Sequence, residues 1–146
     1  MWNEIVNIQD INHFMETVCC FHDSCIKEIK YVSGAYVNEN LSMHPINDKR
    51  VLKVIVQRQF EDNPMIEMEF VGLKKLKLCP VDENYTCEIL DATMFMKDSC
   101  IWWCDCGGVF ELNIEDYDGT IICASQFRWR TIEDCMGDKE YFGEKD

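Results

Sequence analysis

The sequence lacks any apolar run near the roughly 20 residues that a membrane-spanning helix requires. Residues 1–5 also lack the basic and apolar regions of a secretory signal. These two absences predict a cytoplasmic protein that does not cross a membrane. The chain has no internal repeat and no low-complexity segment, and its 146 residues fit one domain spanning 1–146.

The short motifs of common catalytic sites are absent as well. The chain contains neither the nucleophile-elbow motif G-x-S-x-G nor the phosphate-binding motifs G-x-x-x-x-G-K-[ST] and G-x-G-x-x-G. The zinc-protease motif H-E-x-x-H is also missing, and histidine occurs only three times. These absences favour a protein that is not an enzyme, and we predict no catalytic residue, no metal ligand and no cofactor from motifs.

Basic residues are scarce, since 14 Lys and Arg stand against 27 Asp and Glu and give a formal net charge of −13. Nucleic acid and anionic membranes are themselves negatively charged, so neither is expected as a partner. A basic protein partner, by contrast, would be steered towards an acidic surface. The alternative is that the charge only keeps the protein soluble, because net charge reports solubility more directly than partners.

Cysteine, unlike these features, is abundant, with ten residues in the chain. In a cytosolic domain of this size we interpret them as reduced thiols that pack as small apolar side chains, without disulfides. The densest group is Cys100, Cys104 and Cys106, which would share one face of a strand. Structural zinc sites usually take ligands from C-x2-C pairs, and the chain has none. We therefore predict that these thiols fill an apolar sheet face, with a metal site as the alternative.

One segment near the N-terminus has a helical period. Asp10 is a suitable N-cap, because its carboxylate accepts hydrogen bonds from the free amides of the first turn. The apolar residues of the buried stripe are Ile11, Phe14, Met15 and Val18. This pattern predicts a helix from Asp10 to about Cys20, within a helical N-terminal segment of residues 1–20.

The sequence from residue 21 to residue 132 is typical of strands and turns. Residues 25–32 suit a strand or a helix, and we favour a strand because the following strands need a partner. Residues 38–50 are polar, contain Pro45 and indicate a loop. The other predicted strands cover residues 52–57, 66–78 with a bulge at Gly72, 87–96, 100–106, 109–114 and 120–129.

Two tight turns and one shared face complete the prediction. Gly107-Gly108 indicates a hairpin turn before the strand at 109–114, because glycine reaches the positive φ that such turns need. Residues 115–119 indicate a second hairpin loop. Along the last strand, one face is predicted to carry Ile121, Cys123, Phe127 and Trp129.

Consecutive strands joined by short turns should pair antiparallel. The predicted fold class is α+β, mainly β, with an N-terminal helix followed by about seven or eight antiparallel strands in a meander. The strands would form a curved sheet, a sandwich or a partly open barrel across residues 21–132. The charged tail, residues 133–146, is expected to fray.

His22 stands beside Asp23 at the junction between the helix and the strands, and this pair is the candidate for acid–base chemistry. Adjacent residues of an extended chain point to opposite sides, so the pair is not expected to form a hydrogen bond by itself. The alternative is structural, with Asp23 or Ser24 capping a turn while His22 bonds to the backbone. We favour the structural interpretation.

Trp102 and Trp103 are adjacent and would face opposite ways on a strand. One ring enters the core, and the other lies at or near the surface, where it would anchor an interface. If a second layer covers the strand, both rings are buried instead. The candidate binding residues are therefore His22, Asp23, Trp102 and Trp103.

A family resemblance rests on one run, Phe21-His22-Asp23-Ser24-Cys25-Ile26-Lys27-Glu28-Ile29, which follows a short helix and precedes a series of strands. It resembles a pattern in small uncharacterised bacterial proteins, some of which are grouped with the immunity proteins of polymorphic-toxin systems. The resemblance implies a cytosolic, non-catalytic protein that binds and neutralises a toxin domain, often a basic one. It assigns no binding residue.

Two functions remain after these steps. The first is a non-enzymatic, acidic, cytosolic protein-binding domain that is immunity-like. The second is a small enzyme, or a metal or ligand binder, that uses His22 and Asp23 or the face of Cys100, Cys104 and Cys106. An exposed acidic surface with an aromatic anchor favours the first function, whereas a deep pocket in which His22 meets a carboxylate favours the second.

Overall fold

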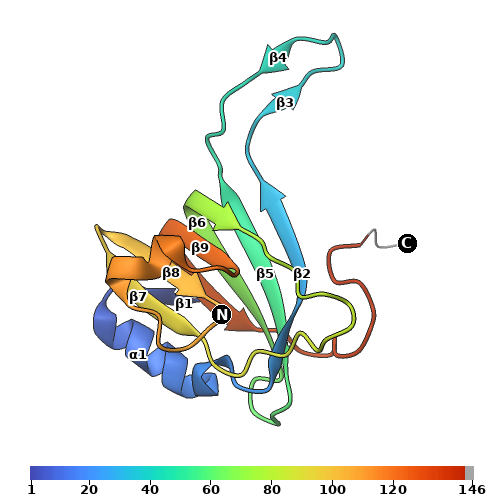
Figure 1. Ribbon diagram of the computed structural model, residues 1–146. Helices are drawn as coiled ribbons and strands as arrows, with labels where there is room; N and C mark the ends of the chain where they lie inside the picture. The colour runs from blue at the N-terminus through green and yellow to red at the C-terminus, as the bar shows by residue number, and fades with distance from the viewer. Residues whose placement is uncertain (144–146) are drawn as a thin grey trace.

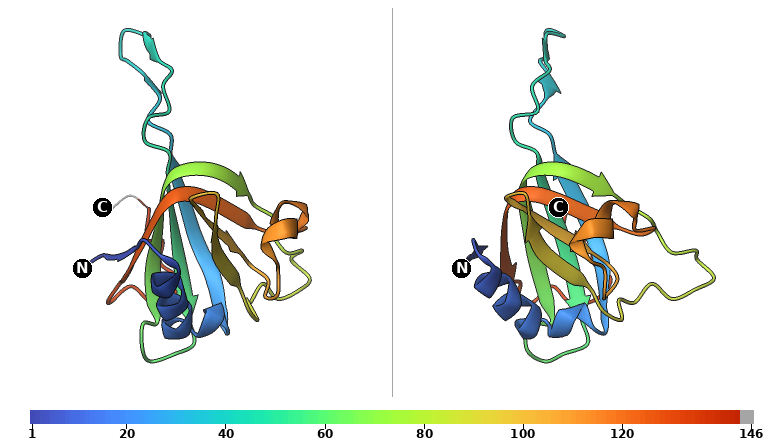
Figure 2. Two further views of the ribbon diagram at one scale, coloured as in Figure 1. Left: turned by 90° about the vertical axis from the view of Figure 1, so that its left-hand side faces the viewer. Right: turned by 60° about the vertical axis from the view of Figure 1, so that its left-hand side comes forward.

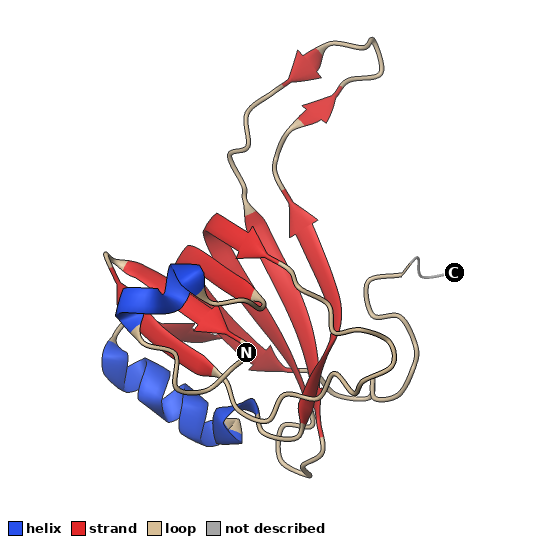
Figure 3. Cartoon of the chain, viewed as in Figure 1, coloured by secondary structure: helices blue, strands red, loops and turns tan. Residues whose placement is uncertain are grey.

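A computed structural model describes residues 1–143 of the chain and confirms a mainly antiparallel β fold with one N-terminal α-helix (Figures 1 and 3). The elements in chain order are β1 (Asn3–Ile5), α1 (Ile8–Thr17), the 3₁₀ turn η1 (Cys19–Phe21), β2 (Ser24–Val32), β3 (Tyr36–Val37), β4 (Met43–His44), β5 (Val51–Arg58), β6 (Met65–Lys77), β7 (Thr93–Lys97), β8 (Cys100–Cys104), the 3₁₀ helix η2 (Glu111–Asp116) and β9 (Ile121–Thr131). No helix within these residues combines the length and the apolar character needed to cross a bilayer.

The main sheet has seven strands in the order β2-β5-β6-β9-β8-β7, and β1 pairs with β9 outside this path. All of its pairings are antiparallel. The order differs from a simple meander because β6 pairs with β9, while the β7–β8 hairpin is added on the far side of β9. The sheet is strongly curved and does not close, so β2 and β7 remain its two edges (Figures 1 and 2).

Helix α1 begins earlier than the sequence pattern predicts. Asn7 is the N-cap, and its side chain accepts a hydrogen bond of 2.8 Å from Asp10 N–H. Asp10 lies in the first turn, and its carboxylate accepts a bond of 3.0 Å from Val6 N–H. The predicted cap at Asp10 is therefore wrong, because Asn7 is the N-cap and Asp10 lies three residues further along. The α-helix ends at Thr17, and a 3₁₀ turn continues the chain.

The core lies on the concave side of the sheet and is centred on aromatic side chains. The Phe14 ring of α1 lies 5.6 Å from that of Phe21, 5.4 Å from that of Phe127 and 5.1 Å from that of Trp129, measured between centroids. Phe21 in turn contacts Trp103 edge-to-face at 5.5 Å. These contacts fasten the helix and the junction after it to the middle of the sheet.

Several predicted strands change in the structure. Residues 25–32 form a strand as favoured, but the strand predicted at 87–96 is regular only in β7. The strand and Gly107 hairpin predicted around 109–114 are wrong, because this segment forms the 3₁₀ helix η2, which covers the outer side of β8. On β9, Ile121 and Cys123 pack on the side opposite Phe127 and Trp129, because the curved sheet bends where Ser125 and Gln126 are both exposed.

The β3–β4 hairpin extends away from the sheet as an arm (Figures 1 and 2). It falls partly within residues 38–50, where the sequence indicated only a loop. Tyr36 stacks on His44 with ring centroids 4.8 Å apart. The arm carries exposed apolar side chains that include Val37, Leu41 and Met43.

The tail covers part of the convex side of the sheet, contrary to the expected fraying. The backbone N–H groups of Tyr141 and Phe142 donate to the two carboxylate oxygens of Glu28, at 2.6 and 3.1 Å. Beneath it, Arg130 bonds to the buried Glu67 at 3.2 Å, and beside that pair Arg128 bonds to Glu69 at 2.9 Å. Residues 133–143 are thus held in place, while residues 144–146 of the predicted tail lie outside the described residues.

Candidate functional site

His22 and Asp23 approach each other, contrary to the prediction for an extended chain. His22 Nε2 lies 3.5 Å from Asp23 Oδ2. The extended-chain premise is wrong here, because Asp23 has a left-handed φ of 55°. His22 Nδ1 lies 2.9 Å from the Leu90 backbone oxygen and Ser24 Oγ donates to the His22 carbonyl at 3.3 Å, so the junction has the backbone bonds of the structural interpretation.

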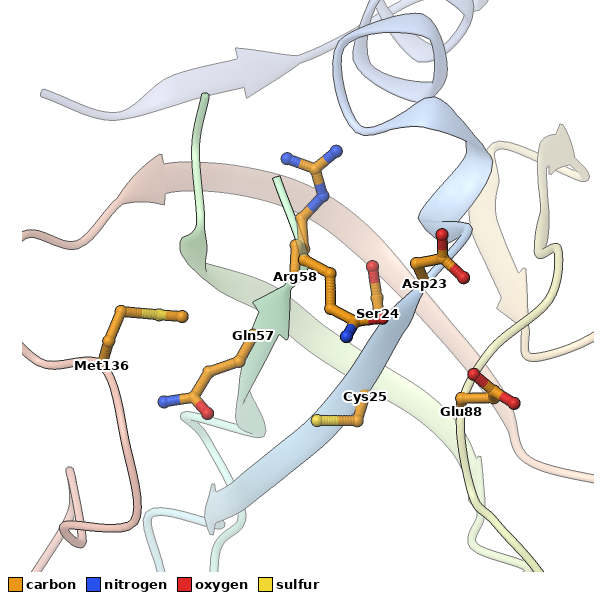
Figure 4. Close-up of a pocket in the computed structure, with 8 residues that line it drawn as sticks. Asp23, Ser24, Cys25, Gln57, Arg58, Glu88 and Met136 are labelled. Atoms are coloured by element: carbon orange, nitrogen blue, oxygen red, sulfur yellow. The ribbon is translucent and has the colours of Figure 1, made fainter. Parts of the chain in front are cut away.

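A cavity of about 360 Å³ opens beside this junction (Figure 4). Its lining comes from the start of β2, the end of β5, the 87–92 segment and the tail, and includes Asp23, Cys25, Gln57, Glu88 and Met136. His22 is not part of the lining. Burial, and then the Cys87 thiol, raises the pKa of Cys25, so this thiol is less ionised than a free cysteine and is a weak nucleophile.

Arg58 also reaches this region, but its guanidinium is used for structure. In Figure 4 the guanidinium lies on the far side from Cys25 and Gln57. Its Nη1 donates to the carbonyl oxygens of Asp62 and Asn63, at 2.9 Å each. The cavity therefore brings together the carboxylates of Asp23 and Glu88 and a poorly ionised thiol, and its lining has no His or Lys that would activate the thiol, so it is a weak arrangement for nucleophilic catalysis.

Of the three cysteines predicted to fill one apolar face of a strand, two are buried on β8 and one is not. Cys100 and Cys104 pack with Cys123 of β9 against Ile114 of η2, whereas Cys106 lies beyond the end of the strand and is exposed. All ten cysteines are free thiols. Within residues 1–143, no group of three or more His, Cys, Asp or Glu side chains is arranged to hold a metal ion.

Trp102 and Trp103 face opposite ways, as expected, but both are buried. Trp103 is fully buried in the main core, and Trp102 is 8% exposed in the second cluster. The second layer over Trp102 consists of the η2 region, where Val109 and Tyr117 pack against the same cluster. Neither ring is therefore presented at the surface as an interface anchor.

The most distinctive surface is formed by two segments that sequence reasoning divided between turns and the strands predicted at 87–96 and 109–114. The first acidic loop comprises residues 78–92, and the second comprises residues 105–120. The first contains four acidic residues and the second five, and neither contains Lys or Arg. These acidic residues are Asp82, Glu83, Glu88, Asp91, Asp105, Glu111, Glu115, Asp116 and Asp118. All of them except the half-buried Asp105 are exposed.

Parts of the two loops meet, and we call the two loops together the acidic surface; both project from the same side of the sheet in Figure 2. Cys79 N–H of the first loop donates to Thr120 Oγ1 of the second at 3.1 Å. A cavity of about 450 Å³ lies between them, lined by Glu88 and Asp91 on one side and by Asp105 on the other. The fold thus gathers negative charge that is dispersed along the sequence.

The second acidic loop has a defined conformation. Asp105 Oδ1 accepts hydrogen bonds from Tyr117 Oη at 2.7 Å and from Thr120 N–H at 3.3 Å. Burial, and then the hydrogen bond to the Asp105 carboxylate, raises the pKa of Tyr117, so the phenol stays protonated and donates this bond. At the other end, Lys97 Nζ donates to the Glu111 carbonyl at 3.1 Å. The carboxylates are therefore presented on an ordered backbone.

Exposed apolar side chains stand among these carboxylates. Tyr85 is 75% exposed, Leu90 68%, Phe110 72% and Leu112 96%. Phe110 and Leu112 alternate in the sequence as they would on one face of a strand. Only the structure shows that both side chains are exposed at the start of η2. The signal that the sequence did carry was the complete absence of Lys and Arg from both loops.

Comparison of the chain with protein-family models, with curated proteins and with solved structures finds no match. The function of the site therefore has to follow from its own geometry.

Proposed function

We propose that the protein is a non-enzymatic, cytosolic binding protein that recognises a basic protein partner through the acidic surface. One observation carries the proposal: the two loops meet at one cavity, and between them they carry exposed carboxylates, exposed apolar side chains and no Lys or Arg. If the charge served only solubility, it would be dispersed over the surface, and exposed aromatic side chains among the carboxylates would have no explanation.

The charge of this face suits long-range attraction. Its carboxylates are exposed, so their field extends into solvent over about 10 Å at moderate salt. An ion pair at its margin joins Lys77 to Asp118 at 3.7 Å, and the Asp118 side chain is fully exposed. Such an exposed pair offsets little of the field, so a basic partner would associate faster than a neutral one.

The apolar side chains suit short-range binding. Aromatic residues at interfaces supply large contact areas at a low entropy cost, and they dominate binding energy when a partner covers them. Tyr85 and Phe110 provide such rings in this face, and Leu112 adds an aliphatic side chain. The carboxylates would then form a polar rim around an apolar centre.

The most specific form of the proposal is immunity-like. The Phe21–Ile29 run resembles that of proteins grouped with toxin-neutralising immunity proteins, and such a role would make the partner a basic toxin domain. The acidic surface supports this form because it matches the charge of such a partner. A toxin gene directly beside the coding gene is expected, whereas a neighbourhood of metabolic genes would count against the immunity-like form.

Selection from a peptide display library tests the binding proposal without requiring a purified partner. The immobilised full chain is offered random peptides of roughly 10 residues, a length that spans a typical binding strand. We expect the enriched peptides to be rich in Lys and Arg together with apolar residues. Enrichment without an excess of Lys and Arg would overturn the proposal, and so would the absence of any enriched peptide.

Matched charge variants locate the site of binding. The surface variant combines Glu83→Gln, Glu88→Gln and Glu111→Gln, and the control combines Glu16→Gln, Glu39→Gln and Glu61→Gln, all at exposed positions outside the two loops. Both variants change the net charge equally. The surface variant is expected to weaken binding of a selected peptide roughly tenfold, and the control by less than about twofold. If both variants lose affinity equally, binding depends only on the net charge of the protein and not on the acidic surface.

A further inference from the structure

The outer edge of β2 has unpaired backbone groups. β2 is the first strand in the sheet order and pairs only with β5. At its start, the first acidic loop adds one antiparallel bridge, in which Ile89 N–H donates to the Ser24 carbonyl at 2.7 Å. Past this bridge, over residues 26–32, the outer edge has no backbone partner among the described residues.

An apolar groove runs beside this free edge. Its volume is about 510 Å³, and it is bounded by Ile26 and Ile29 of β2 and by Leu78, Val81 and Ile89 of the first acidic loop. The groove lies between edge strand β2 and the acidic loops; Figure 1 shows β2 with the first acidic loop running past it. An additional strand paired with the outer edge of β2 would therefore lie in this groove.

The groove is continuous with the acidic surface. Val81, Cys87, Ile89 and Asp105 line both this groove and the cavity between the two acidic loops. The wall facing β2 therefore belongs to a segment rich in exposed carboxylates and without Lys or Arg. An extended segment placed in the groove would have apolar contacts below it and negative charge along one side.

We propose that an extended segment of the basic partner adds to the outer edge of β2 and fills this groove as an additional strand, an inference that rests on the proposed function. Its backbone would pair with residues 26–32, as in other cases of strand addition to an exposed edge. Alternate side chains would be apolar and contact Ile26 and Ile29. The side chains between them would point to the opposite face of the sheet, and Lys or Arg residues next to the paired stretch would lie against the carboxylates of the first acidic loop.

A second copy of the chain fits this edge less well. Lys27 forms a bulge, where the register against β5 shifts between Ile26 and Glu28, and Lys30 follows in the same strand. Two antiparallel β2 edges would bring these lysines near one another, and a bulge or a lysine at an edge disfavours such self-pairing. A partner segment can carry its cations outside the paired stretch, next to the first acidic loop, so it avoids this repulsion.

N-methylation of the selected peptide tests strand addition separately from acidic recognition. In a strand, only alternate backbone N–H groups face the neighbouring strand. Methylating one alternate set is expected to lower affinity for the full chain roughly tenfold, because hydrogen bonds are lost. Methylating the other set is expected to change affinity by less than about twofold. The two peptides have the same composition and charge, so each is the matched control of the other.

Hydrogen exchange of the protein provides the second measurement. Peptide binding should slow exchange at amides of residues 26–32, while amides of the arm strands β3 and β4 keep their rates. If basic peptides bind but tolerate methylation equally in both sets, or leave the β2 amides unprotected, strand addition is overturned and acidic recognition stands. If no basic peptide is enriched, both proposals fail. A concentration-dependent dimer that protects the same amides would also overturn the partner assignment.

Discussion

The Tyr117 hydroxyl donates a hydrogen bond of 2.7 Å to Asp105 Oδ1 and joins the two ends of the second acidic loop. Asp105 follows β8 directly, and Tyr117 comes shortly before β9. The bond therefore holds closed a segment that would otherwise be a long exposed connection. This arrangement allows η2 to cover Trp102 while Leu112 of η2 and the preceding Phe110 face solvent.

Removal of this bond should destabilise the protein. Tyr117→Phe keeps the ring in the cluster but leaves the Asp105 carboxylate without its shortest donor. We expect the free energy of unfolding, measured with urea, to fall by about 1.5–3 kcal/mol, the range for hydrogen bonds to charged groups. Tyr85→Phe is the control, since Tyr85 is 75% exposed. Equal stability of the two variants would contradict this role of Tyr117.

The fold class followed from the sequence because its signals are local. The apolar stripe of α1 and the β-branched alternation of β5 each depend on a few neighbouring residues, and both elements are present. One error was a choice between two local caps, because Asp10 is a good N-cap in isolation, but Asn7 is as good and lies one helical turn earlier. The other error arose where tertiary contacts decide the structure. The Val109–Ile114 alternation looks like a strand, yet β8 pairs directly with β9 and leaves that segment no place in the sheet.

The candidate site was less accessible to sequence reasoning. The negative charge of the acidic surface was visible as composition, but nothing in the sequence indicates that residues 78–92 and 105–120 lie together. That proximity depends on the long-range pairing of β6 with β9, which brings Cys79 to Thr120. The His22–Asp23 contact was also not predictable, since it requires the left-handed backbone of Asp23.

The buried thiols should make the stability of the protein depend on alkaline pH. Burial, and then the neighbouring Cys100 thiol, raises the pKa of Cys123 from 9.0 to about 12. The folded protein thus holds this proton more tightly than the unfolded chain does. The resulting stabilisation is complete below pH 9 and is lost as the pH rises through the window up to about 12.

Urea unfolding across this pH window checks the thiol prediction. Cys123→Ala should reduce the fall in the free energy of unfolding between pH 9 and about 12, although the raised pKa values of Cys25 and Cys104 leave part of the slope in place. Cys135→Ala, at a half-buried position in the tail, is expected to keep the full slope. If Cys123→Ala leaves the slope unchanged, the Cys123 thiol has the same pKa in the folded and unfolded states, and the prediction is wrong.

Glu28 should control the position of the tail. Its carboxylate accepts the backbone N–H groups of Tyr141 and Phe142. Glu28→Gln loses the negative charge and one of the two acceptors, so the tail should detach more often and trypsin should cleave after Lys139 several-fold faster. Glu39→Gln, on the exposed arm, serves as the control. Cleavage at the same rate in both variants would mean that the tail is held by other contacts.

The salt dependence of association tests the central claim most directly. The association rate of a selected basic peptide with the full chain is measured from low to high ionic strength, for the wild type and for the variant with Glu83→Gln, Glu88→Gln and Glu111→Gln. If the acidic surface steers the partner, the wild-type rate falls steeply with salt and the variant has a clearly shallower slope. A rate independent of salt, or identical slopes for the two proteins, would contradict the account.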